Sequence, residues 1–279
     1  MSLGILTNVA ATYAENNLNQ TQNSLQTVLQ QLSSGSRINS GADDAAGLSI
    51  ADGLHANEAA LTQSAQNAQN GVGLLQTADG ALSQVTNLLD RAVTLATEAA
   101  NGGLTSAQST AADTEFQSIL TEIGNIGTST NFNSTAVFST TATDFVVSDG
   151  TTTGTTTISA TIGALSSANV GSGTGVDLSG DDLTSAANAK SAITDITNAV
   201  ADVAAQRGAI GANINQLTAA ANVASSEQVN LSSAESAIRS TNYGQATSDL
   251  AKYQVLSQTG ISALAQANSV QQEILKLLQ

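Results

Sequence analysis

The residues best suited to chemistry in this sequence are a single histidine and a few carboxylates. His55 and Glu58 form a His-x-x-Glu pair, which supplies two of the ligand types that zinc binds in proteins. The sequence has no second histidine and no cysteine, so the remaining ligands of a zinc site are missing. We therefore expect His55 to decorate a helix face, and we expect no metal and no cofactor.

Catalysis by the other polar residues is also poorly supported. Without a further histidine or any cysteine, a serine or cysteine nucleophile has no base to activate it. Asp43 with Asp44 and Asp181 with Asp182 are adjacent pairs, which do not follow the spacing of a calcium-binding loop. They are more typical of turns and helix starts. The sequence predicts that the chain is not an enzyme.

The composition favours long helices over a thick globular core. The 279 residues include no Pro, Trp or Cys, and only 3% are aromatic, so Ala, Leu, Ile and Val carry the apolar content. Small aliphatic residues suit close seams between helices. The formal net charge of −15 makes nucleic acid and anionic membrane poor partners. No stretch is apolar for long enough to predict membrane insertion.

Two series of apolar residues repeat at strict intervals of seven and predict two coiled-coil helices. The first series is Leu54, Leu61, Ala68, Leu75, Leu82, Leu89 and Ala96. The second is Ile196, Val203, Ile210, Leu217, Ala224, Leu231 and Ile238. Half-heptad partners such as Val72, Val93, Ile193, Val200, Ile214 and Ala221 complete each seam. The first helix is expected from Gly47 to about Ala100.

The two ends of the chain carry apolar residues at helical spacing but very little charge. Glu15 is the only charged residue between positions 1 and 36, where the apolar positions include Leu3, Leu6, Leu25, Leu29 and Leu32. Residues 250–279 show the same pattern, with Ile261, Leu264, Ile274 and Leu277. Such a stripe is marginal in water without a partner that covers it. The hypothesis is that both ends are disordered in the monomer and fold together on assembly.

The middle of the chain, about residues 128 to 182, is rich in Thr, Ser and Gly. The run Asp144–Val147 and the Thr-rich run that reaches Ile162 flank an Asp149-Gly150 turn, which predicts a β-hairpin. We interpret this segment as a small folded and exposed tip, with a flexible linker as the alternative. The predicted fold class is therefore mainly α, a long helical hairpin or coiled-coil bundle with a small β-hairpin tip.

Specific stretches of the sequence resemble bacterial flagellins. The segment from Leu29 to Leu54, LQQLSSGSRINSGADDAAGLSIADGL, resembles the N-terminal signature of that family, and LAQAN at 264–268 resembles the C-terminal one. The helical phrase LTSAANAKSAITDITNAVADVAAQRGAIGANINQL also fits, so the likeness covers nearly the whole chain. Since the chain passes almost directly from hairpin to returning helix, it looks like a minimal flagellin without variable outer domains.

The resemblance implies a structural subunit that polymerises head-to-tail into the flagellar filament for motility. It implies an inner helical region formed by residues 1–40 and 250–279, and a coiled-coil rod at 41–249. The terminal helices would form the filament core. The expected assembly residues are the nine apolar ones named above for the two ends, together with Arg37. Asp43 and Asp44 could make polar contacts in the connection from Ser33 to Gly53, for which a merely solvated loop is the alternative.

The resemblance also implies partners and a location. The partners would be further copies of the chain, a flagellar export chaperone and a cap protein, and the location would be extracellular, after export without a cleaved signal peptide. Recognition by Toll-like receptor 5 would involve Arg91, Leu95 one helical turn later, and Glu115.

Two rival classes remain open at this point. A hook-filament junction protein shares the terminal helices, although the strong N-terminal signature favours flagellin. A secreted adhesin or autonomous coiled coil leaves the nearly uncharged ends unexplained.

Overall fold

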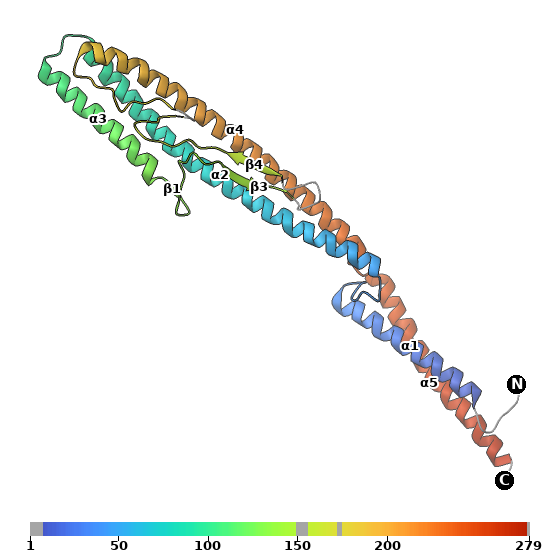
Figure 1. The fold of residues 1–279 in the computed structure, drawn as a ribbon. Coiled ribbons are helices and arrows are strands. Elements are labelled where there is room, and N and C mark those ends of the chain that lie inside the picture. Colours follow the sequence, from blue (N-terminus) through green and yellow to red (C-terminus); the bar gives the residue numbers. More distant parts are fainter. Residues whose placement is uncertain (1–7, 149–155, 172–174, 278–279) are drawn as a thin grey trace. The chain divides into compact units, whose positions relative to one another are not determined.

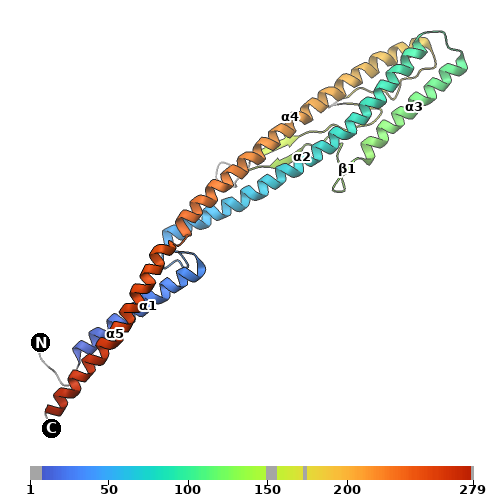
Figure 2. The same ribbon diagram turned by 180° about the vertical axis from the view of Figure 1, so that it is seen from behind.

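In the part of the chain that the structure describes, the fold consists of five helices and two small antiparallel strand pairs, seen from two sides in Figure 1 and Figure 2. The computed structural model describes residues 8–148, 156–171 and 175–277. The helices are α1 (Val9–Ser34), α2 (Ala45–Ala100), α3 (Ser106–Ser129), α4 (Ala186–Arg239) and α5 (Tyr243–Leu277). The strands are β1 (Asn131–Phe132), β2 (Thr135–Ala136), β3 (Thr143–Val146) and β4 (Thr157–Ala160).

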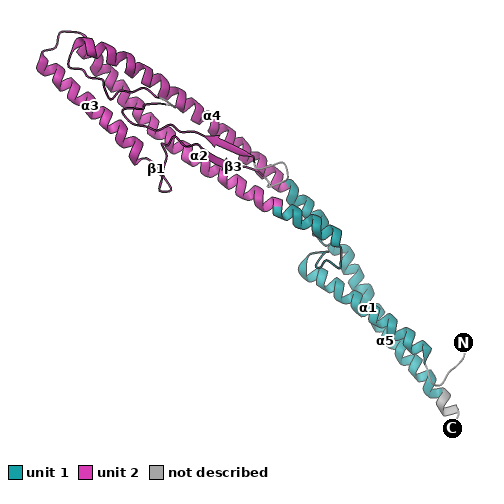
Figure 3. Ribbon diagram, in the orientation of Figure 1, with its two compact units in different colours: residues 1–56, 230–279 teal, residues 57–229 magenta. Residues whose placement is uncertain are grey.

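The chain divides into two compact units (Figure 3), each described by itself below. Unit 1 contains residues 1–56 and 230–279, and unit 2 contains residues 57–229. The division into an inner region and a rod, with borders near residues 40 and 250, stays a prediction. Within the part of the chain that the structure describes, no helix is long and apolar enough to cross a membrane.

Unit 2 is built around the two predicted heptad seams, which confirms that part of the sequence interpretation. Leu75, Leu82 and Leu89 of α2 are fully buried, as are Ile196 and Val203 of α4. The half-heptad residues, which flank these positions, are partly buried and pack against the same core. The unbroken length of α2, from Ala45 to Ala100, follows from the absence of Pro and the sustained repeat.

Helix α3 completes the core of unit 2 and was not anticipated as a separate element. Its start is fixed by a capping box in which Thr105 and Gln108 satisfy each other's backbone N–H groups. Phe116 and Ile123 face inward and are fully buried, so α3 covers a side of the core that two helices would leave open. Figure 1 shows α3 running beside α2 in unit 2.

The predicted hairpin exists, but it is not an exposed tip. Strands β3 and β4 pair antiparallel, with Asp144 opposite Ser159 and Phe145 opposite Ile158. The predicted turn at Asp149-Gly150 lies outside the described residues. Ile158 and Ala160 of β4 are buried in the core of unit 2, and the burial continues along the chain to Leu183. The segment packs back along the helices because its alternate β-branched and Leu residues need an apolar surface.

Two further contacts hold this irregular segment in unit 2, and neither has a signal in the sequence. The buried side-chain amide of Gln206 on α4 donates to the Gly171 carbonyl at 3.2 Å and accepts from the Gly163 N–H at 3.1 Å. Gly127 of α3 lies so close to the Leu165 carbonyl that an added Cβ would clash with its oxygen. The chain between β4 and α4 is therefore positioned by a polar bridge and by a close backbone approach.

Candidate functional site

The terminal helices α1 and α5 of unit 1 pack side by side in opposite directions and form a narrow seam. Asn8 donates to the Ala267 carbonyl at 3.0 Å at one end, and Thr241 donates to the Gln31 carbonyl at 3.3 Å at the other. Most of the less exposed positions follow spacings of three and four residues, as in a coiled coil. They are Ala11, Ala14, Leu18, Thr21, Leu25, Val28 and Leu32 on α1, and Ala246, Leu250, Tyr253, Ser257, Gly260, Leu264, Ala267 and Gln271 on α5.

This seam covers only part of the apolar surface of the two helices. Val28, at 8% exposure, is the one buried residue of α1, and Ala246, at 6%, is the one in the described part of α5. Large apolar side chains outside the seam stay exposed on several sides of α1 and α5, and seven of them are called the open apolar face below. It consists of Val9, Tyr13 and Leu29 on α1 and Val255, Leu256, Ile261 and Val270 on α5, with exposed fractions between 42% and 68%.

Exposed apolar side chains in this number are typical of an interaction surface. Charge is sparse around it, because unit 1 carries four basic and seven acidic residues, whereas unit 2 carries three basic and fifteen acidic residues. Unit 1, whose apolar side chains are exposed, is thus the unit that repels a second copy of the chain only weakly.

The structure places the predicted assembly residues in two groups. Leu25, Leu32 and Leu264 lie in the seam, where they join α1 to α5, whereas Leu29 and Ile261 belong to the open apolar face. Leu3 and Leu6 lie outside the described residues. Ile274 and Leu277 lie in α5, and their side chains are outside the description. The single stripe expected on each end is therefore split between an internal contact and a free surface.

Arg37 lies in the loop between α1 and α2, which is tightly held within unit 1. Helix α1 is capped after Ser34 by Gly35, whose φ of 71° is the left-handed conformation that glycine adopts easily. The Arg37 guanidinium donates to the Ile238 carbonyl at 2.8 Å, and the Arg37 backbone N–H donates to the Arg239 carbonyl at 2.6 Å. Arg37 thus satisfies carbonyl groups at the C-terminal end of α4, where a cation is favourable.

Asp43 and Asp44 confirm the prediction of turn and helix-start residues. The Asp43 carboxylate accepts from the backbone N–H groups of Asn39 and Ser40, which lowers its pKa because the hydrogen bonds favour the charged form. Asp44 accepts from the Gly47 N–H at 2.8 Å at the start of α2. The alternative of a merely solvated loop is therefore wrong for this connection.

The three predicted receptor residues occupy different environments in unit 2. Arg91 of α2 and Glu115 of α3 form a two-bonded ion pair at 2.7 and 3.1 Å, and both side chains are about half exposed. The hydrogen bonds between the two side chains raise the pKa of Arg91 and lower the pKa of Glu115. Leu95 is 3% exposed and packs in the core of the unit. The ion pair is accessible from solvent, whereas Leu95 is not.

Asp181 and Asp182 also behave as turn and helix-start residues, but their pKa values shift in opposite directions. The Asp182 carboxylate accepts from the Thr184 N–H and hydroxyl and from Asn188, which lowers its pKa. The pKa of Asp181 is raised to about 6 by burial and then by the negative charges of Asp195, Asp177 and Asp182. One Asp181 oxygen is buried without a hydrogen-bond partner. Unit 2 therefore holds a carboxyl group that loses its proton less readily than an ordinary aspartic acid.

The comparisons with known proteins agree with one another. The family model described as the bacterial flagellin N-terminal helical region matches residues 5–143, and the one described as the C-terminal helical region matches residues 193–278. A flagellin of Halalkalibacterium halodurans is 32% identical over 271 residues, which cover 97% of this chain and 98% of that protein. A flagellar filament 30.7 kDa core protein of Treponema maltophilum is 30% identical over 280 residues, with the same shares.

Among solved structures, a crystal structure of Bacillus cereus flagellin aligns with 57% of this chain and 88% of that chain, at 28% identity and a TM-score of 0.47.

Proposed function

Because the chain belongs to the bacterial flagellin family, we propose that it polymerises head-to-tail into the flagellar filament through the open apolar face of α1 and α5. Flagellins are structural subunits of that filament, so the general role follows from membership of the family. The proposal adds which surface makes the contacts between subunits. The observation that carries it is the set of large apolar side chains left exposed on two helices that already pack against each other.

The energetics favour association once this face is covered. Complete burial of a Val, Leu or Ile side chain is worth about 1.5–3 kcal/mol, and the open apolar face holds seven large apolar residues that are still roughly half exposed. A part of that gain offsets the loss of freedom when a subunit joins the polymer. Identical subunits that meet through two different surfaces form an open helical array when the rotation between neighbours does not close into a ring.

The two sets of assembly residues then have different roles. The seam residues Leu25, Leu32 and Leu264 would hold α1 against α5, and Leu29 and Ile261 would contact neighbouring subunits. The shallow burial of the seam supports the hypothesis that the terminal helices are weakly ordered in an isolated subunit and become stable on assembly.

A truncation tests this proposal. Removal of residues 1–30 deletes most of α1, exposes the α5 side of the seam and removes three of the seven residues of the open apolar face. We expect the truncated chain to stay monomeric in electron micrographs taken after a salting-out salt has been added, whereas the full chain forms long filaments. Filaments from the truncated chain would refute the proposal. Short rings from the full chain would favour a hook-filament junction protein.

A second proposal is recognition by Toll-like receptor 5 through the exposed pair Arg91 and Glu115, with Leu95 fixing the position of α2. Arg91→Ala should weaken receptor signalling, since it removes a charge that is accessible to a partner. Lys190→Ala, which removes another exposed cation of unit 2, is the matched control. Unchanged signalling by the Arg91 variant would contradict this role.

The remaining partners and the location are proposed on family membership. They are an extracellular place in the filament, a flagellar export chaperone and a cap protein. Co-purification of the full chain with such a chaperone, and loss of that complex in the truncated chain, would support binding through the terminal helices.

A further inference from the structure

The only histidine of the sequence meets a carboxylate from a distant part of the chain. His55 on α2 and Glu235 on α4 both belong to unit 1, and His55 Nδ1 lies 3.5 Å from Glu235 Oε2. The imidazole is 69% exposed, whereas the Glu235 side chain is 17% exposed. Glu235 is 180 positions away from His55, so no local motif in the sequence joins the two.

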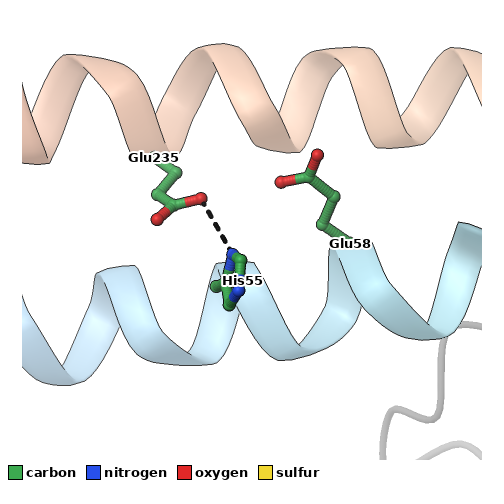
Figure 4. A group of neighbouring side chains, drawn as sticks. All are labelled: His55, Glu58 and Glu235. Carbon is green, nitrogen blue, oxygen red and sulfur yellow. Dashed lines mark ion pairs between the residues drawn. The ribbon is translucent and has the colours of Figure 1, made fainter.

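A third ligand comes from the same helix as the histidine. Glu58 follows His55 by three residues, and this spacing places the two side chains on one helix face, one turn apart. One ligand atom from each of His55, Glu58 and Glu235 lies within 4.8 Å of the others. Figure 4 shows the imidazole and the two carboxylates directed toward a common space.

The second oxygen of Glu235 is held by a neighbouring cation. Arg239 Nη1 lies 3.1 Å from Glu235 Oε1 and 3.8 Å from Asp52 Oδ1. This contact fixes the Glu235 carboxylate so that its other oxygen faces His55. An outer contact of this kind orients a metal-binding carboxylate and lowers the cost of organising the site.

We propose that His55, Glu58 and Glu235 bind a divalent transition-metal ion of the zinc type. One imidazole nitrogen and two carboxylate oxygens are the ligand types of three-residue zinc sites, in which water fills the remaining position. Around one zinc ion such atoms lie about 3 to 3.5 Å apart, so small rotations of the exposed side chains close the site. The two carboxylates balance the charge of the ion.

The ligand set also predicts which ions bind poorly. Calcium and magnesium prefer six or more oxygen ligands, and a site with one imidazole and two carboxylates offers too few of them. The imidazole instead favours zinc, nickel and cobalt. Since only the neutral imidazole binds a metal, acidification should release the ion.

Calorimetric titration of the full chain with zinc chloride tests the proposal. The chain is kept monomeric in low-salt buffer at pH 7.5, so the result does not depend on whether the chain polymerises. We expect one zinc ion per chain, and we expect zinc to raise the melting temperature.

Three variants locate the ion. His55→Gln and Glu58→Gln should each weaken zinc binding at least tenfold and abolish the rise in melting temperature. Glu98→Gln, which neutralises another exposed carboxylate on α2, is the matched control and should bind zinc as the parent chain does. Melting curves without metal establish that each variant is folded.

The proposal would be overturned by any of three results: no zinc binding by the parent chain, equal zinc binding by His55→Gln, or equally strong binding of magnesium. The last two would identify ordinary surface carboxylates as the ligands.

Discussion

Units 1 and 2 both contain helices that pack along seams with coiled-coil spacing, but the two seams differ in how completely they are covered. In unit 2, α3 and the segment that follows it close over the contact of α2 with α4, so Leu75, Leu82 and Leu89 are fully buried. Among the described residues of unit 1, α1 and α5 pack mainly against each other, and Val28 is the one buried residue of α1. A heptad repeat thus specifies a seam, while the number of elements around it decides whether a surface is left for another subunit.

The charges divide in the same way. Unit 2 carries a formal net charge of −12 and unit 1 carries −3. The self-contained unit is the strongly charged one, which suits a surface that faces water, and the unit with the open apolar face is nearly neutral.

The largest effect that distinguishes the two units should come from removing a core side chain. Leu82→Ala leaves a cavity in the closed core of unit 2 and should lower the free energy of unfolding by about 3–4 kcal/mol. Leu25→Ala in the shallow seam of unit 1 should cost about 1 kcal/mol, because that side chain is only partly buried. Urea unfolding followed by circular dichroism measures both. An equal loss in the two variants would mean that unit 1 is as tightly closed as unit 2.

A smaller effect should come from filling the close approach between α3 and the segment after β4. Gly127→Ala places a methyl group against the Leu165 carbonyl and should destabilise the chain by about 1–3 kcal/mol. Gly124→Ala on the same helix meets nothing within 4 Å and should stabilise it by about 0.5–1 kcal/mol. Thermal unfolding of the two variants should therefore shift in opposite directions. A neutral Gly127→Ala variant would show that the segment is loosely held.

The smallest effect concerns pH and is confined to unit 2. The raised pKa of Asp181 means that its contribution to stability is fully present below about 3.8 and is lost as the pH rises through about 6. Asp181→Asn should therefore stabilise the chain at pH 7.5 by about 1 kcal/mol, after allowance for solvent screening, and by much less at pH 4.5.

The neighbouring residue gives the matched control for this prediction. The lowered pKa of Asp182 gives a contribution that is present above about 3.8 and is lost as the pH falls further. Asp182→Asn should therefore destabilise the chain at pH 7.5. Denaturant unfolding at the two pH values measures both variants, and a stabilising Asp182→Asn would contradict the account of the hydrogen bonds around Thr184.

The sequence predicts the features that repeat. The strict heptads fix α2 and α4, and the alternation around Phe145 and Ile158 is sufficient to pair β3 with β4. Helix α3 was missed as a separate element because its capping box is local and its inward face lacks a long repeat. The prediction of an exposed hairpin tip was wrong, because Ile158 is buried, and its burial depends on which helices lie nearby.

The candidate site was predictable in composition but not in geometry. A stripe of apolar residues does not tell which side faces the partner helix, so Leu25 and Leu29 were placed in one class although the structure separates them. Polar Thr21 and Ser257 lie in the seam and carry no apolar signal. Glu235 could not be assigned to His55 from the sequence, because only the fold brings together positions that far apart.

The measurement that tests the central claim most directly compares two exposed apolar sites in polymerisation. Val255 on α5 and Val223 on α4 are similarly exposed, at 62% and 64%, but only Val255 belongs to the open apolar face. The account predicts that Val255→Asp combined with Ile261→Asp abolishes filaments in electron micrographs, because charges buried in an apolar contact are costly. Val223→Asp should leave filament formation unchanged. Filaments from the double variant, or their loss in Val223→Asp alone, would contradict the assignment of assembly to the terminal helices.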